Sequence, residues 1–160
     1  MKKKIYNIED IPENFINGPD SEDDMMTKYL GALAGSEKMY INIDYVKPNA
    51  KSAKYHSHTH QEEFFIILEG KGRVRLSGKE YEVKKGDFFA KPPGKGIAHQ
   101  FINDSNEMLV ILDCGIKSEN DMIMYPDEGI LLFKRDKLVF KKIDSKTWDS
   151  DPNWDKAGDI

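Results

Sequence analysis

Residues 56–70 read HSHTHQEEFFIILEG, and this stretch decides the fold. Three of the four histidines of the chain fall here, at positions 56, 58 and 60, and two glutamates follow them. Residues 64–68 are a continuous apolar run of strand length, which Glu69 and Gly70 end. On an extended strand the side chains at i, i+2 and i+4 point to the same face, so these histidines can converge on one point. The stretch therefore predicts a strand next to a cluster of imidazole rings.

Further strands are predicted along the rest of the chain. Residues 39–46 and 72–76 alternate in the manner of half-buried strands. Further runs, separated by polar, glycine or proline residues, lie at 64–68, 81–83, 88–90, 98–102, 108–113, 130–133 and 137–143. Strands spaced about eight to twelve residues apart are typical of an antiparallel barrel or sandwich. We therefore predict a mainly all-β protein.

The chain is expected to form one domain, because 160 residues divided in two would leave each half too small for a sizeable core. We predict an N-terminal arm with a short helix at 1–35, a barrel at 36–143 and a tail at 144–160. Within the arm, residues 17–24 are an acidic, turn-rich loop, and residues 25–33 are the predicted helix. The tail holds Trp148 and Trp154 among aspartates, and we expect it to lie on the barrel or on a partner subunit.

The composition restricts the class of protein. A formal net charge of −4 argues against nucleic-acid binding, which needs a basic face. Residues 7–12 contain polar and acidic residues and a proline where the apolar part of a signal peptide would begin. No stretch approaches the roughly 20 apolar residues of a membrane span. The single cysteine, Cys114, cannot form an internal disulfide, which agrees with a reducing compartment. We expect a cytoplasmic protein that binds neither nucleic acid nor membranes.

The histidine cluster predicts a metal site. A lone histidine is more often a hydrogen-bonded core or surface residue, but three within five residues, followed by Glu62 and Glu63, favour metal binding. The alternative is a solvated cluster at the end of a strand. The fourth histidine, His99, follows the Pro-Pro-Gly turn at 92–94, and strand pairing in a barrel can bring it back to the same interior site.

Two motifs of the chain resemble those of the cupin superfamily, whose fold is a small double-stranded β-helix, or jelly-roll, barrel. The first cupin motif is a glycine, five residues, His-x-His, three or four residues, a glutamate, six residues and a glycine. Here His56, His58, Glu63 and Gly70 keep this spacing, while Ala50 stands at the leading glycine.

The second motif is a glycine, five residues, Pro-x-Gly, two residues, a histidine, three residues and an asparagine. Gly86, Pro92, Gly94, His99 and Asn103 supply it, but four residues rather than two separate Gly94 from His99. From the first residue of the first motif to the last residue of the second, the two motifs span about a third of the chain. They are specific for fold and metal site and say little about the reaction, because this fold hosts many chemistries.

The resemblance implies that His56, His58, Glu63 and His99 hold one divalent metal ion. From the residues alone, positions 56 and 58 share a face, whereas Glu63 is out of phase with them. A bulge or bend between 59 and 62 must therefore re-aim the strand, and without it Glu62 would share the histidine face. Nitrogen and oxygen ligands without thiolate suit Fe(II), Mn(II), Ni(II), Co(II) or Zn(II). Four chain ligands leave one or two positions open on an octahedral ion, as in catalytic metal sites.

His60 and the surroundings of the site leave several interpretations open. His60 replaces His56 in a shifted register, contacts the substrate, or points outward at the rim. Phe65 and Ile67 continue the face of Glu63, and Phe101 shares the face of His99, so these three are expected to form an apolar wall around one small ligand. Six polar residues either contact the ligand or, equally well, lie on the outer surface of the barrel: Tyr40, Asn42, Arg73, Arg75, Lys91 and Gln100.

The leading functional hypothesis is a metal-dependent enzyme that acts on a small organic molecule, with oxygenase, decarboxylase or isomerase chemistry as the resemblance implies. The alternative is a non-catalytic cupin that binds or senses a small ligand. A third hypothesis is a metal-free barrel whose histidines contact the substrate directly. We also expect a homodimer, because an open barrel leaves strand edges that need covering.

Overall fold

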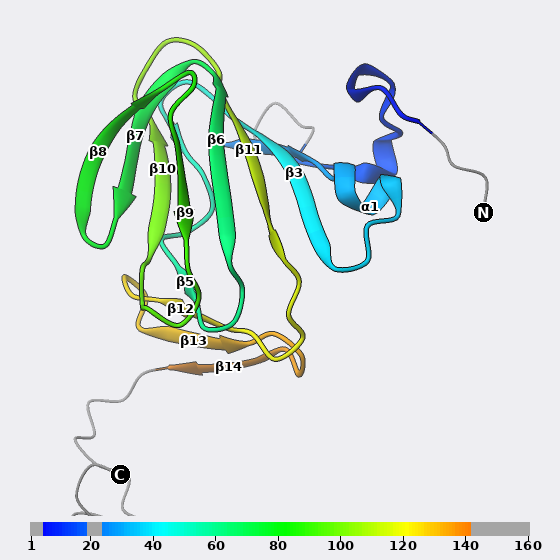
Figure 1. The fold of residues 1–160 in the computed structure, drawn as a ribbon. Helices are drawn as coiled ribbons and strands as arrows, with labels where there is room; N and C mark the ends of the chain where they lie inside the picture. Colours follow the sequence, from blue (N-terminus) through cyan, green and yellow to red (C-terminus); the bar gives the residue numbers. More distant parts are fainter. Residues whose placement is uncertain (1–4, 19–23, 142–160) are drawn as a thin grey trace, which may run out of the picture.

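A computed structural model describes residues 5–18 and 24–141 and shows an antiparallel β-barrel (Figure 1). The first sheet has six strands, in the order β1 (Ile16–Asn17), β2 (Met25–Lys28), β3 (Met39–Val46), β11 (Leu109–Ile116), β6 (Glu63–Glu69) and β9 (Phe88–Lys91). The second has four, in the order β4 (Ala50–Lys51), β10 (His99–Asn103), β7 (Lys71–Leu76) and β8 (Lys79–Lys84). The third has four, in the order β14 (Leu138–Lys141), β13 (Ile130–Phe133), β12 (Met122–Tyr125) and β5 (Ser57–His58). The predicted all-β, jelly-roll class is confirmed.

The first and second sheets face each other, and the third lies across one end of the barrel (Figure 1). The core fills the space between them, and its buried members include Val46, Phe65, Ile67, Val74, Phe101, Leu109 and Ile111. Strand β6 shows how the apolar run at 64–68 is used. Its alternate residues Glu63, Phe65 and Ile67 are buried, while Phe64 lies on the outer face and is 37% exposed. The polar Glu63 thus sits at one end of a buried row that is otherwise apolar.

Gly70 ends β6 with a backbone that only glycine adopts without strain. Its φ is +77°, and a Cβ atom there would lie 2.3 Å from the carbonyl oxygen of Met108. This glycine therefore lets the chain turn back into β7 close to the start of β11.

The predicted helix at 25–33 is wrong in its first half. Residues 25–28 form β2, which pairs with β3, and Thr27 Oγ1 donates a hydrogen bond of 2.6 Å to Asp44 on that strand. Pairing with a strand distant in sequence outweighs the local helix preference here. The helix α1 spans only Leu30–Ala34 and ends at Gly35, whose φ is 78°. Two short 3-10 helices precede it, at Ile8–Asp10 and Glu13–Phe15.

The strands β1 and β2, which fall within the predicted N-terminal segment 1–35, thus belong to the six-stranded sheet. The predicted tail with Trp148 and Trp154 lies outside the described residues. Over the part of the chain that the structure describes, no helix is long and apolar enough to cross a membrane.

Candidate metal centre

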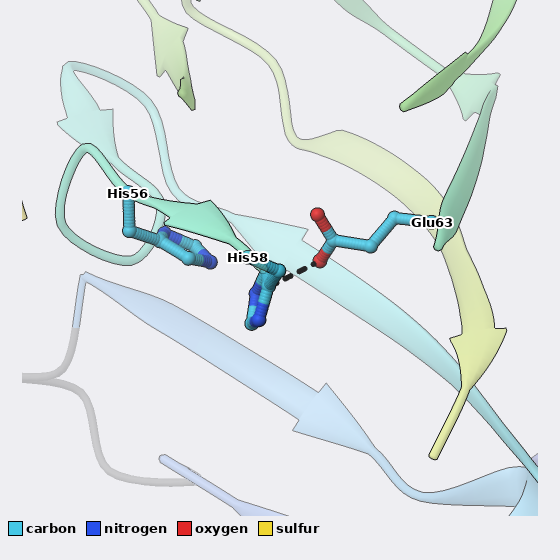
Figure 2. A group of neighbouring side chains, drawn as sticks. All are labelled: His56, His58 and Glu63. Atoms are coloured by element: carbon cyan, nitrogen blue, oxygen red, sulfur yellow. Dashed lines mark ion pairs between the residues drawn. The ribbon is translucent and has the colours of Figure 1, made fainter. Parts of the chain in front are cut away.

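The first-motif residues reach the site from two different sheets. His56 directly precedes β5 and forms an isolated bridge with His99, His58 lies within β5, and Glu63 is the first residue of β6. The non-strand residues 59–62 carry the chain from the third sheet to the first. The distortion that the sequence required between 59 and 62 is therefore a change of sheet. It removes the parity conflict between His58 and Glu63 (Figure 2).

His56, His58 and Glu63 form a compact group. Each offers one ligand atom, and these atoms all lie within 4.8 Å of one another. Figure 2 shows the carboxylate of Glu63 pointing at the ring of His58, with Nε2 of His58 3.3 Å from Oε1 of Glu63. His58 and Glu63 are buried, and His56 is partly exposed.

Both histidines are held so that the same ring nitrogen is available. Nδ1 of His56 lies 2.6 Å from the backbone oxygen of Lys54, and Nδ1 of His58 lies 2.5 Å from Oδ2 of Asp121. An oxygen acceptor at Nδ1 fixes the proton there and leaves the Nε2 lone pair free. Two imidazole nitrogens of this kind and one carboxylate fit a divalent transition metal ion. The three side chains could therefore hold such an ion, whose identity the donor set leaves open.

Asp121, which sequence reasoning missed, organises this corner of the site. It is 1% exposed, and its Oδ1 accepts hydrogen bonds from the backbone N–H groups of Thr59 and His60, at 3.1 and 3.0 Å. Burial alone would raise the pKa of Asp121, but the hydrogen bonds from His58 and His60 outweigh it and lower the pKa. The residue lies 63 positions from His58, with no repeated spacing to reveal it.

His99 lies beside the group but is not part of it. Its ring centroid is 4.8 Å from that of His56, and its Nδ1 is 3.9 Å from Oε2 of Glu63. Burial lowers the pKa of His99 well below its usual value, and the nearby Lys91 lowers it further.

Lys91 is the unexpected member of the cluster. It is 2% exposed and directly opposite Glu63 in the β6–β9 register. Its Nζ forms a close ion pair with Oε2 of Glu63 and lies 2.6 Å from Nδ1 of His99. Oε2 has no further hydrogen-bond partner among the described residues. Burial would raise the pKa of Glu63, but the His58 hydrogen bond and the charges around it hold that pKa well below the usual range.

A row across three strands places a hydroxyl next to Glu63. Tyr40 on β3 pairs with Gly115 on β11, which pairs with Glu63 on β6. A Cβ on Gly115 would lie 2.8 Å from the hydroxyl oxygen of Tyr40, so the missing side chain is what lets the phenol cross the strand. The hydroxyl lies 2.9 Å from Oδ1 of Asp113 and 3.3 Å from Oε1 of Glu63.

Several titratable side chains near this row have perturbed pKa values. Burial, with the charges of Asp44 and Glu63, raises the pKa of Asp113 to about 8. Burial also raises the pKa of Asp44 to about 6 and lowers that of His56 to about 4. Burial together with Asp113 and Glu63 raises the pKa of the Tyr40 phenol. Perturbed acids gathered beside possible metal ligands are typical of functional sites.

The group opens into a cavity of about 1150 Å³. Buried or partly buried polar side chains line its inner part: Tyr40, Asn42, Asp44, Gln61 and Asp113, together with the three possible ligands. Four exposed basic side chains from loops line it as well: Lys38, Lys117, Lys134 and Arg135. Glu37 and Glu119 lie among them.

The other predicted site residues fall elsewhere. His60 is exposed, bonds to Oγ1 of Thr59 through its Nδ1, and does not line the cavity, so the shifted register is wrong. Glu62 is exposed as well. Phe65, Ile67 and Phe101 belong to the core rather than to the cavity wall, because each is 2% exposed and none of them lines the cavity. Arg73 pairs with Glu80 and Asp104, and Arg75 pairs with Asp127, on the outer face.

Fold and site together define a class: a small jelly-roll barrel with a candidate His-His-Glu metal centre in an open cavity. The cupin domain family model matches residues 43–115, which include His56, His58, Glu63, Lys91 and His99. The chain belongs to the cupin superfamily.

Similar proteins include two solved structures and one curated relative. A protein of Acidithiobacillus ferrooxidans named as a candidate sugar phosphate isomerase is 28% identical, with a TM-score of 0.72 over 78% of this chain and 80% of that one. A cupin sugar phosphate isomerase of Silicibacter pomeroyi is 25% identical, with a TM-score of 0.71 over 79% and 82%. An uncharacterized protein of Methanocaldococcus jannaschii is 38% identical over 69 residues, which are 43% of this chain and 54% of that protein. The chain thus spans about half the length of this curated relative.

Proposed function

We propose that the chain is a metal-dependent isomerase that acts on a small hydroxy-carbonyl compound carrying an anionic group, of the sugar phosphate type. The observation that carries this proposal is that one cavity is lined by the buried group His56, His58 and Glu63 and by exposed basic side chains. The names of the two solved structures that cover most of this chain agree with it.

Isomerisation of a hydroxy-carbonyl compound moves one proton between neighbouring carbons and one between the oxygens that they carry. A divalent metal ion held by the group would act as a Lewis acid toward the substrate oxygens. Side chains of the protein would supply the acid–base catalysis. The Tyr40 hydroxyl joins Asp113 to Glu63 through contacts of 2.9 and 3.3 Å, so Asp113 is linked to one of the possible metal ligands through a single hydroxyl group. A carboxyl whose pKa is about 8 can take and return a proton near neutral pH.

The basic side chains give the substrate its orientation. Lys134 is held toward the site by a hydrogen bond of 3.0 Å from its Nζ to Oε1 of Gln61, and Arg135 follows it in the β13–β14 turn. Point charges of this kind bind phosphate or carboxylate groups. An anionic group held among these loops would leave the other end of a small molecule to reach the buried group.

The test uses metal-reconstituted protein and a panel of aldose and ketose phosphates, with the unphosphorylated sugars for comparison. Incorporation of solvent deuterium at the carbon next to the carbonyl is followed by NMR. We expect exchange with at least one phosphate, no exchange for His58→Ala, and loss of exchange with retained metal for Asp113→Asn.

Reversing the charge of a basic side chain tests separately whether these side chains orient the anionic substrate. Lys134→Glu should raise KM for the phosphorylated substrate at least tenfold with little change in kcat, whereas the exposed Lys85→Glu should change neither. Metal-loaded protein that binds members of the panel without exchange would overturn the proposal in favour of a ligand-binding cupin. Oxygen uptake or CO₂ release without exchange would overturn it in favour of an oxygenase or a decarboxylase.

A further inference from the structure

The three histidines His56, His58 and His99 differ in what holds their Nδ1 atoms. His56 and His58 each face an oxygen acceptor, the backbone of Lys54 and the carboxylate of Asp121. His99 instead faces the amino group of Lys91 at 2.6 Å. The difference decides which nitrogen of each ring has a lone pair to give.

A lysine ammonium offers donors and no acceptor. Paired with Glu63, Lys91 donates to Nδ1 of His99, so the proton of the neutral His99 ring sits on Nε2. One nitrogen is then occupied by the lysine and the other by its own proton. His99 is left without a free lone pair, whereas His56 and His58 each keep one at Nε2.

Because of Lys91, the two carboxylate oxygens of Glu63 have different partners. Its Nζ pairs with Oε2, and Oε1 faces Nε2 of His58. The amino group stands between Oε2 and Nδ1 of His99, two atoms that are 3.9 Å apart. It thus occupies the place at which a metal ion would have to sit to bind both of them.

We propose that the metal centre of this cupin has three chain ligands, Nε2 of His56, Nε2 of His58 and Oε1 of Glu63, and that Lys91 replaces a fourth by engaging His99. Lys91 is a positioning residue, because it does not line the cavity. Three chain ligands leave up to three positions of an octahedral ion for substrate and water, as in facial two-histidine, one-carboxylate sites. This inference rests on the metal centre of the proposed function but not on its reaction, and its tests measure no turnover.

The first test uses the unaltered protein with ¹⁵N-labelled histidine. Nitrogen chemical shifts and their coupling to ring protons report which nitrogen carries the proton. Without metal, His56 and His58 should carry it on Nδ1 and His99 on Nε2. On addition of one equivalent of Zn(II), the Nε2 shifts of His56 and His58 should change to metal-bound values while His99 stays protonated on Nε2. A metal-bound shift for His99 would overturn the proposal.

The second test measures the affinity for Zn(II) by competition with a chromophoric chelator. His99→Gln should weaken binding by less than about threefold, whereas His58→Ala should weaken it by about 100-fold or more, beyond the range of outer-shell changes. Lys91→Met frees His99, so binding should tighten by about tenfold, and the gain should vanish in the Lys91→Met/His99→Gln double variant. A loss for His99→Gln equal to that for His58→Ala would overturn the proposal. A Lys91→Met variant that melts cooperatively and binds Zn(II) with unchanged affinity would overturn the proposal as well.

Discussion

Asp121→Asn is the substitution that keeps the shape of the residue beside His58 but changes which nitrogen of the His58 ring carries the proton at the candidate metal centre. The amide has the shape of the carboxylate but only one oxygen. At present Oδ1 accepts from the backbone of Thr59 and His60, and Oδ2 accepts from Nδ1 of His58. With the amide oxygen kept toward the two backbone N–H groups, the NH₂ group faces Nδ1 of His58, donor against donor. His58 then has to move its proton to Nε2, the nitrogen that the metal needs.

The size of the effect follows from this geometry. Loss of the partner that orients a metal-binding histidine lowers metal affinity by about 10- to 100-fold, which corresponds to about 1.4 to 2.8 kcal/mol. The metal-free protein should lose stability too, because a buried charge-assisted hydrogen bond is replaced by a mismatched contact, at a cost of about 1–3 kcal/mol.

The assay is a Zn(II) competition titration combined with the ¹⁵N histidine spectrum. We expect weaker binding and a His58 proton that has moved to Nε2. Asp104→Asn is the matched control, since that aspartate pairs with Arg73 on the outer face, and it should leave both readouts unchanged. Folded Asp121→Asn that binds Zn(II) as tightly as the unaltered protein would refute the reasoning, and so would a His58 proton still on Nδ1.

Three further predictions concern the cavity and the core. Because the pKa of Asp113 is raised from 3.8 to about 8, folding favours its protonated form. In the metal-free protein its contribution to stability is therefore lost as the pH rises from about 4 to about 8, by up to about 1.4 kcal/mol per unit. Asp113→Asn should flatten the pH dependence of urea unfolding, and parallel curves for the two proteins would contradict this. In Gly115→Ala the new Cβ would lie 2.2 Å from the Glu62 carbonyl oxygen and 2.7 Å from the Tyr40 ring. Unfolding should therefore need about 1–3 kcal/mol less free energy, and an unchanged urea midpoint would count against that packing. Phe65→Ala should cost about 3–5 kcal/mol in thermal unfolding. The control Phe88→Ala, at a site 69% exposed, should cost under about 0.5 kcal/mol, and equal losses would contradict the assigned core.

The strands could be predicted from the sequence because their signals are local. Alternation at 39–46 and the apolar run at 64–68 were enough to place β3 and β6, and both strands are where we expected them. The segment at 25–28 was misread because its strand character comes from pairing with β3 and from the contact between Thr27 and Asp44. Neither is visible in a window of neighbouring residues.

In the site, too, residues with a local sequence signal could be predicted, and residues that depend on long-range contacts could not. Strand alternation placed His56 and His58 on one face, and the resemblance to the cupin motif added Glu63, which required an interruption of the strand before it. Neither indicated Asp121, which reaches His58 across 63 positions, or the buried place of Lys91, which alternation allowed equally on the outer face. Long-range partners of this kind have no periodic signal, because they depend on which strands the fold brings together.

In the proposed metal centre, the partners of the histidine Nδ1 atoms would determine the chemistry as much as the motif does. The motif places three imidazole rings close together, with centroids of the neighbouring pairs 5.0 and 4.8 Å apart. Which of them can bind a metal depends on a backbone oxygen, a distant aspartate and a lysine, none of which is a ligand of the motif. Chains that share the spacing can therefore differ in the number of ligands, and so in the number of positions open to substrate. A lysine directly opposite the motif glutamate is the residue by which such a difference can be recognised in this chain.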